Sequence, residues 1–240
     1  MKVALILSGH YRTFASNLVY FKQCVMNNND ADVYLDLWDT YGYWYPDMVD
    51  GFNKETDKIN PDSIKSLLKD SLKYLNIDNW ENHRDFFIQK GLLYEKTKVV
   101  YDKSKPDGAS RPANLISLWY KRYKGVTAMN ESGIKYDRVV LTRPDVRLKN
   151  TIDMYNGNLE LANSYADHTR GYADIFFNGS QQQITDLAEV YNHMEETLQV
   201  DMEFCGHSLM KWWLPKKQIP FEAKSYEIEL VNTPQGYCKL

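Results

Sequence analysis

Residues 143–147, with the sequence Arg-Pro-Asp-Val-Arg, carry the side chains best suited to chemistry, because two guanidiniums flank one carboxylate. They follow a short apolar run that is typical of a strand covered on both faces. The proline lacks a backbone donor and favours an extended residue before it, so the strand is expected to end here. If the chain then stays extended, Arg143, Asp145 and Arg147 point the same way.

This charge pattern has two interpretations. The first is a surface cluster of ion pairs at a strand end, since two guanidiniums and a carboxylate are costly to bury without partners. The second is a site for an anionic ligand such as a diphosphate, with a metal ion on Asp145. These residues alone leave both interpretations open.

The first strand is predicted at Val3–Leu7, an uninterrupted apolar run followed by a turn and an amphipathic helix. Ser8, Gly9 and Arg12 lie in that turn, where backbone N–H groups face an anion in many α/β proteins. A single glycine is not a dinucleotide-binding fingerprint. The alternative is that Gly9 is needed only for the positive φ of a tight turn and that Arg12 is a solvated residue at the start of the helix.

A second strand is predicted at residues 32–39, where apolar and polar residues alternate. Trp38 and Asp39 end it, on the ligand side of an open parallel sheet. The aromatic loop at residues 41–46 either packs onto the domain or accepts a ring-shaped ligand.

The remaining pattern alternates between helices and strands and has no repeat or low-complexity linker, which favours one domain. Helices are expected at 60–75, beginning at Asn60, at 81–90, at 114–129, at 181–197 and from 201 onward. Strands are expected at 99–101, at 171–180 and, at an edge, at 226–231.

Composition excludes several classes of protein. The 240 residues suffice for one large α/β domain, and a net charge of -3 with mixed signs argues against a dedicated nucleic-acid binder. No apolar run reaches the roughly 20 residues of a membrane span, and the first residues lack the features of a signal peptide. Three widely spaced cysteines indicate neither a disulfide framework nor a zinc site. A soluble, intracellular protein is expected.

Four segments occur in an order that resembles a known family: residues 5–13, 32–39, 136–145 and 172–180. Together they resemble the small glycosyltransferase-like proteins of large DNA viruses (chlorovirus-like) and of bacterial surface-glycan clusters. These are similar to nucleotide-sugar transferases of the GT-A fold. The resemblance runs from Val3 to about Leu214, although residues 41–112 carry no part of it. It implies a single α/β, GT-A-like (Rossmann-like) domain with a mostly parallel sheet flanked by helices. Residues 1–135 would form the nucleotide-binding half and residues 136–240 the half for the donor sugar and the acceptor.

The resemblance also implies a nucleotide-diphosphate sugar donor, UDP-linked, bound across the carboxyl ends of the strands. The donor-binding residues expected on this basis are Ser8, Gly9, Arg12, Trp38, Asp39, Arg143, Asp145 and Arg147. Outside the resemblance, further candidates for donor binding are His10 and, at the start of the helix predicted at 114–129, Arg111, Asn114 and Ser117. Such enzymes usually carry an Asp-x-Asp metal motif where this chain has Asp145 and Arg147. Either Asp145 holds Mn²⁺ or Mg²⁺ with help from the diphosphate, or the arginines neutralise the diphosphate without metal.

Glycosyl transfer with inversion also needs a carboxylate that accepts the proton of the acceptor hydroxyl. The candidates are Asp174, at the mouth of a strand, and Glu203, at a helix start. The alternative for Asp174 is a structural aspartate that accepts hydrogen bonds in a turn. The alternative for Glu203 is a negative charge at a helix N-terminus that the helix dipole stabilises. His10 and His207 could contact substrate or metal, but a lone histidine is more often structural.

The resulting hypothesis is a glycosyltransferase that moves a sugar, a hexose or a pentose, from its nucleotide donor to a hydroxyl of a surface or capsid glycan. It would act in the cytoplasm, or in the host cytoplasm if the chain is viral. The main alternative is a non-catalytic module that binds nucleotide sugars or glycans. A second alternative is another nucleotide-dependent transferase on the same sheet.

Overall fold

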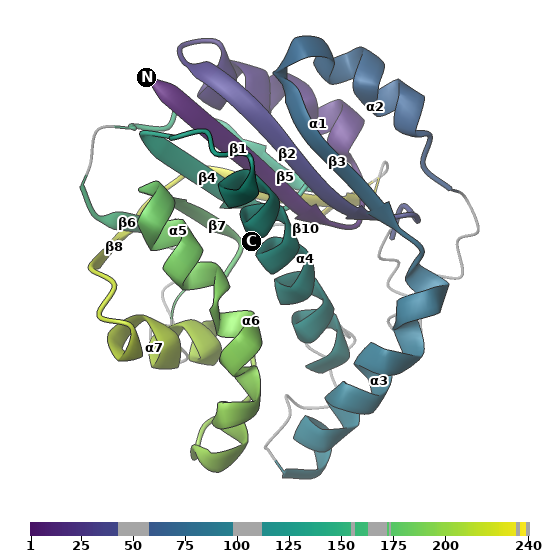
Figure 1. The fold of residues 1–240 in the computed structure, drawn as a ribbon, viewed down its shortest axis with the longest axis vertical. Coiled ribbons are helices and arrows are strands. Elements are labelled where there is room, and N and C mark those ends of the chain that lie inside the picture. Colours follow the sequence, from purple (N-terminus) through teal and green to yellow (C-terminus); the bar gives the residue numbers. More distant parts are fainter. Residues whose placement is uncertain are drawn as a thin grey trace.

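The protein is an α/β fold built on one seven-stranded sheet, as a computed structural model shows (Figure 1). The structure describes residues 1–42, 58–97, 112–154, 157–162, 172, 174–233 and 236–238. The strand order is β3-β2-β1-β4-β7-β6-β8, and of these strands β7 alone runs antiparallel to its neighbours. The strands are β1 (Lys2–Gly9), β2 (Asp30–Trp38), β3 (Leu72–Asp78), β4 (Arg138–Thr142), β6 (Leu159–Ala162), β7 (Phe176–Gly179) and β8 (Phe221–Lys224).

A small antiparallel sheet, with the order β10-β9-β5, packs behind the main one. Its strands are β5 (Val146–Leu148), β9 (Ile228–Thr233) and β10 (Gly236–Cys238). The α-helices are α1 (Phe14–Phe21), α2 (Pro61–Leu68), α3 (Trp80–Thr97), α4 (Pro112–Glu131), α5 (Gln181–Ala188), α6 (Val190–His193) and α7 (Gly206–Lys216). Short π or 3-10 segments follow α1 (η1, Lys22–Met26), α2 (η2, Lys69–Ser71) and α6 (η4, Met194–Gln199).

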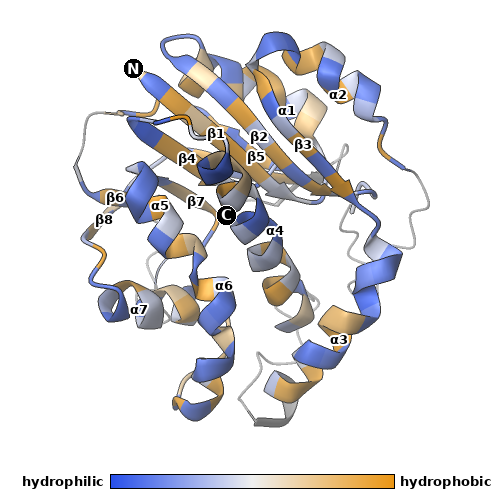
Figure 2. Ribbon diagram, viewed as in Figure 1, coloured by the Kyte–Doolittle hydropathy of each residue, from blue (hydrophilic) through white to orange (hydrophobic). Residues whose placement is uncertain are grey.

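Both faces of the main sheet are covered, which explains the continuous apolar runs of its central strands. Ala4 and Ile6 of β1 share a core with α3, α4, α5 and α7. Leu5 and Leu7 share a second core with α1, α2 and the small sheet. Hydrophobic residues accordingly run along the inner strands, while the helices mix both kinds (Figure 2). The predicted α/β class, with a mostly parallel sheet flanked by helices, is confirmed.

The central strand β1 lies at the point where the order of the sheet reverses. Leu5 pairs with Val33 of β2 on one side and with Val140 of β4 on the other, both in parallel. The chain moves outward to β2 and β3 and then returns to place β4 beside β1. In open α/β sheets, ligands bind outside the carboxyl ends of the strands at such a reversal. The ends of β1 and β4 are therefore the first place to look for a site.

Several predicted boundaries were wrong. The helix expected through residue 75 ends at Leu68, because Lys69 adopts a φ of 49° and Leu72 begins β3. Its predicted start is confirmed, since the Asn60 side chain accepts a hydrogen bond from the Asp62 backbone. The helix expected at 181–197 is divided among α5, α6 and η4.

The last helix starts at Gly206 rather than at residue 201. Cys205 is its N-cap, and the Cys205 sulfur accepts a hydrogen bond from the Ser208 backbone N–H. The predicted strand at 99–101 and most of the aromatic loop lie outside the described residues. The division into halves at residue 135 stays a prediction. None of the described helices is both long and apolar enough to cross a membrane.

Candidate functional site

The turn after β1 holds Arg12 in a conformation that most residues avoid. Gly9 has a φ of 114° and Arg12 a φ of 45°, and the Arg12 backbone N–H donates to the Tyr41 carbonyl at 2.8 Å. A left-handed conformation costs a non-glycine residue roughly 1–2 kcal/mol. Strain of this kind persists where the surroundings impose it, and it is frequent at functional sites. Here the turn brings the Arg12 side chain to the end of β4.

Asp145 is buried between two guanidiniums at the end of β4. Arg143 donates from Nε to Oδ1 at 2.9 Å and from Nη2 to Oδ2 at 2.6 Å, and Arg12 donates from Nη1 to Oδ2 at 3.1 Å. The Asp145 side chain is 0% exposed, whereas the side chains of Arg12 and Arg143 are each 20% exposed. A ligand can therefore reach the arginines but not the carboxylate that holds them.

Burial alone would raise the pKa of Asp145, but the charges of Arg143 and Arg12 and the hydrogen bond from Arg143 outweigh it. The pKa of this carboxyl consequently lies below its usual range, and Asp145 is ionised at neutral pH. Burial lowers the pKa of Arg12, against the attraction of Asp145, but a guanidinium stays charged.

A third guanidinium, that of Arg122, comes from α4. Its side chain is fully buried and lies over the rings of Trp119 and Phe177, with its central carbon 4.5 and 5.3 Å from their centroids. Nη2 donates to the backbone carbonyl of Asp174, while Nε and Nη1 have no partner in the described structure. Burial lowers the pKa of Arg122 to about 10, and the nearby charges of Asp174, Arg143 and Asp145 also act on it.

Asp174 completes the group that we call the arginine site: Arg12, Arg122, Arg143, Asp145 and Asp174. The Asp174 side chain lies against Gly206 at the start of α7, where a Cβ atom would meet Oδ2 at 2.0 Å. Its charge opposes the effect of burial on the pKa of Arg122, and it adds to the larger effect of Asp145, which raises the pKa of Arg143. Three cations face two carboxylates, so the arginine site keeps one positive charge in excess. It can bind an anion with bidentate hydrogen bonds.

The chain does not stay extended through residues 143–147, the condition under which Arg143, Asp145 and Arg147 would point the same way. The Val146 backbone N–H donates to the Arg143 carbonyl at 3.2 Å, which closes a turn before β5 begins. Arg147 therefore joins the small sheet, where it lies over the Tyr20 ring and 3.6 Å from a carboxylate oxygen of Glu229. The structure does not bring Arg147 together with Arg143 and Asp145.

Trp38 and Asp39 are occupied by the fold. Trp38 is buried among the rings of Trp80, Phe87 and Tyr120. Asp39 accepts hydrogen bonds from Lys58, from Asn79 at 2.9 Å and from the Trp80 backbone at 2.9 Å, which ties the end of β2 to the start of α3. The sequence had indicated that both side chains face a ligand, but in the structure both are engaged with other parts of the fold.

Ser8 and His10 also face inward. Ser8 is buried beneath Gly125 of α4, where an added Cβ would lie 3.3 Å from Oγ, so the glycine permits close approach of the helix. His10 pairs with the Thr40 hydroxyl at 3.2 Å and packs edge-on against Trp80. Burial, with a contribution from Arg12, lowers the pKa of His10 to about 3, so it is neutral at physiological pH.

The other predicted residues are scattered around the arginine site. Ser117 is buried in α4 and donates to the Asn114 carbonyl at 3.0 Å, and Asn114 is partly buried near the start of that helix. Glu203 lies in the segment before α7, near Cys205, whose pKa is raised chiefly by burial and further by Glu203 and Asp174. Arg111 lies outside the described residues.

A second buried charge cluster fixes α4 to the sheet. The ammonium of Lys121 lies 2.7 Å from carboxylate oxygens of Asp36 and Asp78 and 4.2 Å from the centroid of Trp38. Burial raises the pKa of Asp36 against the attraction of Lys121. Hydrogen bonds from Lys121 and Lys124 outweigh burial at Asp78 and lower its pKa to about 2. These charges satisfy one another, so the cluster is structural.

The donor set at Asp145 does not fit a divalent cation. Mn²⁺ and Mg²⁺ collect several oxygen ligands, and both oxygens of Asp145 already accept from guanidiniums. In the part of the chain that the structure describes, no three His, Cys, Asp or Glu residues lie together as a metal site. No chemical step is therefore assigned to a metal here.

Sequence reasoning missed Arg122 and Lys121. In the helix predicted at 114–129, Trp119, Val126 and Met129 lie on one apolar stripe. Arg122 lies on the same stripe, three residues after Trp119 and four before Val126. A charged residue on a buried helical face is the signal that could have identified it.

Comparisons with known proteins add little. No family model matches the chain, and no curated protein sequence matches it. Among solved structures, the chain is similar to the crystal structure of mouse xyloside xylosyltransferase 1 in its apo form, with a TM-score of 0.43 and 8% identity. That alignment covers 93% of this chain and 85% of the other. A similarity this distant carries no conclusion about activity. The fold and the site define the molecule as an α/β protein with a cationic site at the strand ends.

Proposed function

We propose that the protein is a glycosyltransferase that takes a sugar from a nucleotide diphosphate, UDP in the simplest case, and attaches it to a hydroxyl of a glycan. One observation carries this proposal: Arg12 and Arg143 meet on Asp145 at the ends of β1 and β4, where the strand order reverses. Both guanidiniums remain partly exposed, and planar guanidiniums suit the oxygens of a diphosphate. The order of four parallel strands followed by antiparallel β7 also agrees with the expected GT-A-like architecture.

The guanidiniums would act on the leaving group. As the bond between the anomeric carbon and the diphosphate oxygen breaks, negative charge builds up on the diphosphate. Arg12 and Arg143 are already held in place by Asp145, so little reorganisation is needed to stabilise that charge. Asp145 is then a positioning residue rather than a ligand for the donor.

Asp174 is the better candidate for the catalytic base. In an inverting reaction the acceptor oxygen bonds to the anomeric carbon, the diphosphate leaves with the bonding electrons, and the acceptor proton passes to a carboxylate. Asp174 lies beside Arg122 and Arg143, and its carboxylate accepts no hydrogen bond from the described residues. Glu203 is the second candidate, since it shares the surroundings of Cys205 with Asp174.

The test is ligand binding followed by turnover. A panel of nucleotides and nucleotide sugars is screened by thermal shift, and the ligands that raise Tm are then assayed for sugar release and transfer. We expect at least one UDP-sugar to stabilise the fold and Arg143→Ala to weaken UDP binding measured by calorimetry. Arg84→Ala is the matched control, because Arg84 is exposed on α3 and pairs only loosely with Glu81, at 3.4 Å. A fold that no nucleotide stabilises would contradict the proposal.

The alternative of a non-catalytic binding module has one observation in its favour. The carboxylate at the expected metal position is fully engaged by arginines, as it would be in a site that binds a nucleotide sugar without processing it. Such a module would bind UDP and release no sugar, with or without manganese. The turnover assay therefore separates the two functions.

A further inference from the structure

Arg122 is a buried cation with spare hydrogen-bonding capacity. Nε and Nη1 have no partner among the described residues, and the indole Nε1 of Trp119, beneath the same guanidinium, also has none. Three donor nitrogens thus lie together without an acceptor among the described residues. Buried donors are almost always satisfied, and leaving a charged one unpaired is costly.

Arg122 is directed at the arginine site and not at an unrelated part of the core. Its Nη2 group donates to the Asp174 carbonyl, and its pKa responds to Arg143 and Asp145 as well as to Asp174. An oxygen-rich ligand held by Arg12 and Arg143 would supply acceptors for the free donors of Arg122. Entry of that ligand requires a local shift of the residues that cover Arg122, because its side chain is fully buried.

The same site is unfavourable for a divalent cation. Any cation bound to Asp145 would lie next to two guanidiniums that already use both carboxylate oxygens. Positive charges in such close contact repel one another strongly in a buried site. Three guanidiniums, by contrast, supply fixed positive charge and directed hydrogen bonds.

We propose that Arg12, Arg122 and Arg143 together bind the diphosphate and take the place of a divalent cation, so that the anion is held without metal. The diphosphate itself is the ligand named under Proposed function, and the inference rests on it. What is new is the role of Arg122 and the independence of binding from Mn²⁺ or Mg²⁺.

Calorimetry with two probes tests the metal-independence. Inorganic pyrophosphate and UDP are each titrated into the 240-residue chain in EDTA. The UDP titration is then repeated in excess MnCl₂. We expect both probes to bind in EDTA and manganese to change the Kd of UDP by less than about twofold, because the ion finds no ligand set at the site. Binding of UDP that disappears in EDTA and returns with manganese would overturn the inference.

A pair of variants tests Arg122. Arg122→Met keeps a long side chain between Trp119 and Phe177, and it removes an unsatisfied charge. We expect pyrophosphate affinity to fall at least about tenfold while Tm stays the same or rises. A merely structural arginine would give the opposite result, a lower Tm with unchanged affinity, and that result would overturn the role.

Arg138→Met is the matched control at the other end of β4. The Arg138 guanidinium is buried but donates to the Asn178 side chain, the Asn178 carbonyl and the Asn158 carbonyl. Its loss should lower Tm and leave pyrophosphate affinity unchanged. The contrast between the two variants separates a binding arginine from a structural one.

The outcomes also distinguish the inference from the proposed function. If pyrophosphate binds in EDTA but no nucleotide does, the arginine site stands as an anion site and the nucleotide-sugar function fails. If UDP binds only with manganese, the inference fails and the proposed function survives. If neither probe binds in EDTA and UDP does not bind with manganese either, the inference and the proposed function are both wrong.

Discussion

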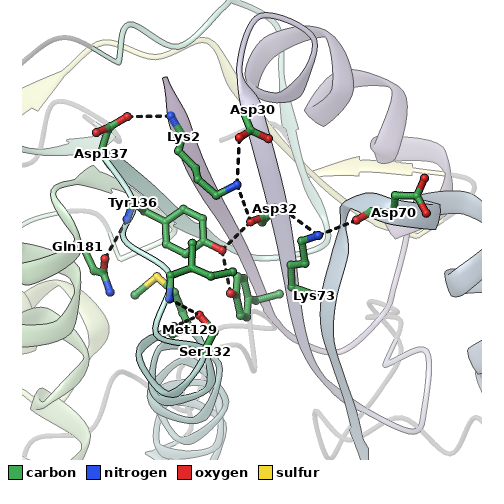
Figure 3. Close-up of polar contacts among 12 residues, drawn as sticks. Lys2, Asp30, Asp32, Asp70, Lys73, Met129, Ser132, Tyr136, Asp137 and Gln181 are labelled. Atoms are coloured by element: carbon green, nitrogen blue, oxygen red, sulfur yellow. Dashed lines mark hydrogen bonds and ion pairs between the residues drawn. The ribbon is translucent and has the colours of Figure 1, made fainter.

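The two ends of the central sheet use charge in different ways. At the amino end, the Lys2 ammonium contacts Asp30 and Asp32, and the Tyr136 hydroxyl donates to Asp32 at 2.8 Å (Figure 3). The Lys2 backbone N–H donates to Asp137 at 2.8 Å. These groups face one another across β1, β2 and the start of β4, so each of the three carboxylates has a donor within the fold.

The carboxyl end is different because its cations exceed its carboxylates. Asp145 holds Arg12 and Arg143, while two nitrogens of Arg122, Nε and Nη1, have no partner in the described structure. The amino end thus stabilises the sheet, and the carboxyl end gives up some stability to keep a binding capacity. This contrast is what a ligand site at a strand-order reversal predicts.

The largest effect is expected from Asp145→Asn. The variant keeps the shape of the side chain but leaves the partly exposed Arg12 and Arg143 without the buried carboxylate that neutralises them, and breaking a buried pair costs about 3–5 kcal/mol. Urea denaturation measures the loss. Pyrophosphate should then raise the Tm of the variant more than that of the wild type, because the anion replaces the lost carboxylate. A loss below about 1 kcal/mol would remove the contrast between the two ends.

Gly206→Ala tests Asp174 without changing its chemistry. The added methyl group would lie 2.0 Å from Oδ2 of Asp174 and must push the carboxylate aside. If Asp174 is the base, turnover should fall about 100-fold while UDP affinity and Tm change little. Gly157→Ala is the matched control, since its added Cβ meets nothing within 4 Å. Unchanged turnover in Gly206→Ala would exclude Asp174 as the base.

Asp32→Asn provides the counterpart at the amino end. Asp32 accepts from Tyr136 and lies 3.1 and 3.5 Å from the ammonium groups of Lys2 and Lys73, two partly exposed side chains. Because a neutral amide can still accept from the tyrosine, the expected loss is about 1–2 kcal/mol by urea denaturation. Pyrophosphate affinity should not change. A clear fall in affinity would show that the amino end is coupled to the binding site.

The smallest effect concerns the pH dependence of His10. Burial lowers its folded pKa to about 3, whereas the unfolded chain titrates near 6.5. The unfolded state therefore binds the extra proton first, and this contribution to stability is complete above pH 6.5 and is lost as pH falls toward 3. In His10→Gln, the free energy of unfolding should fall less between pH 7 and pH 5 than in the wild type. Equal slopes would contradict a buried, neutral His10.

The sequence alone determined the framework of the sheet and part of the site. Continuous apolar runs predict buried strands wherever they occur, so β1, β2 and β4 were found at nearly their true places. Since the ends of parallel strands share one edge, Arg12, Arg143 and Asp145 could be expected to meet. The strands β3, β5, β6, β8 and β10 were missed, because none of them is a continuous apolar run.

Tertiary structure decided which charges belong to the site. Arg12 and Asp145 are 133 positions apart, and Arg122 reaches the Asp174 carbonyl across 52 positions, so no local pattern links them. A single turn after Arg143 sends Arg147 to the small sheet instead. Residue types and strand ends are local properties of the chain, whereas burial and charge pairing depend on which segments the fold brings together, and that is why the sequence located the edge but not the full set of arginines.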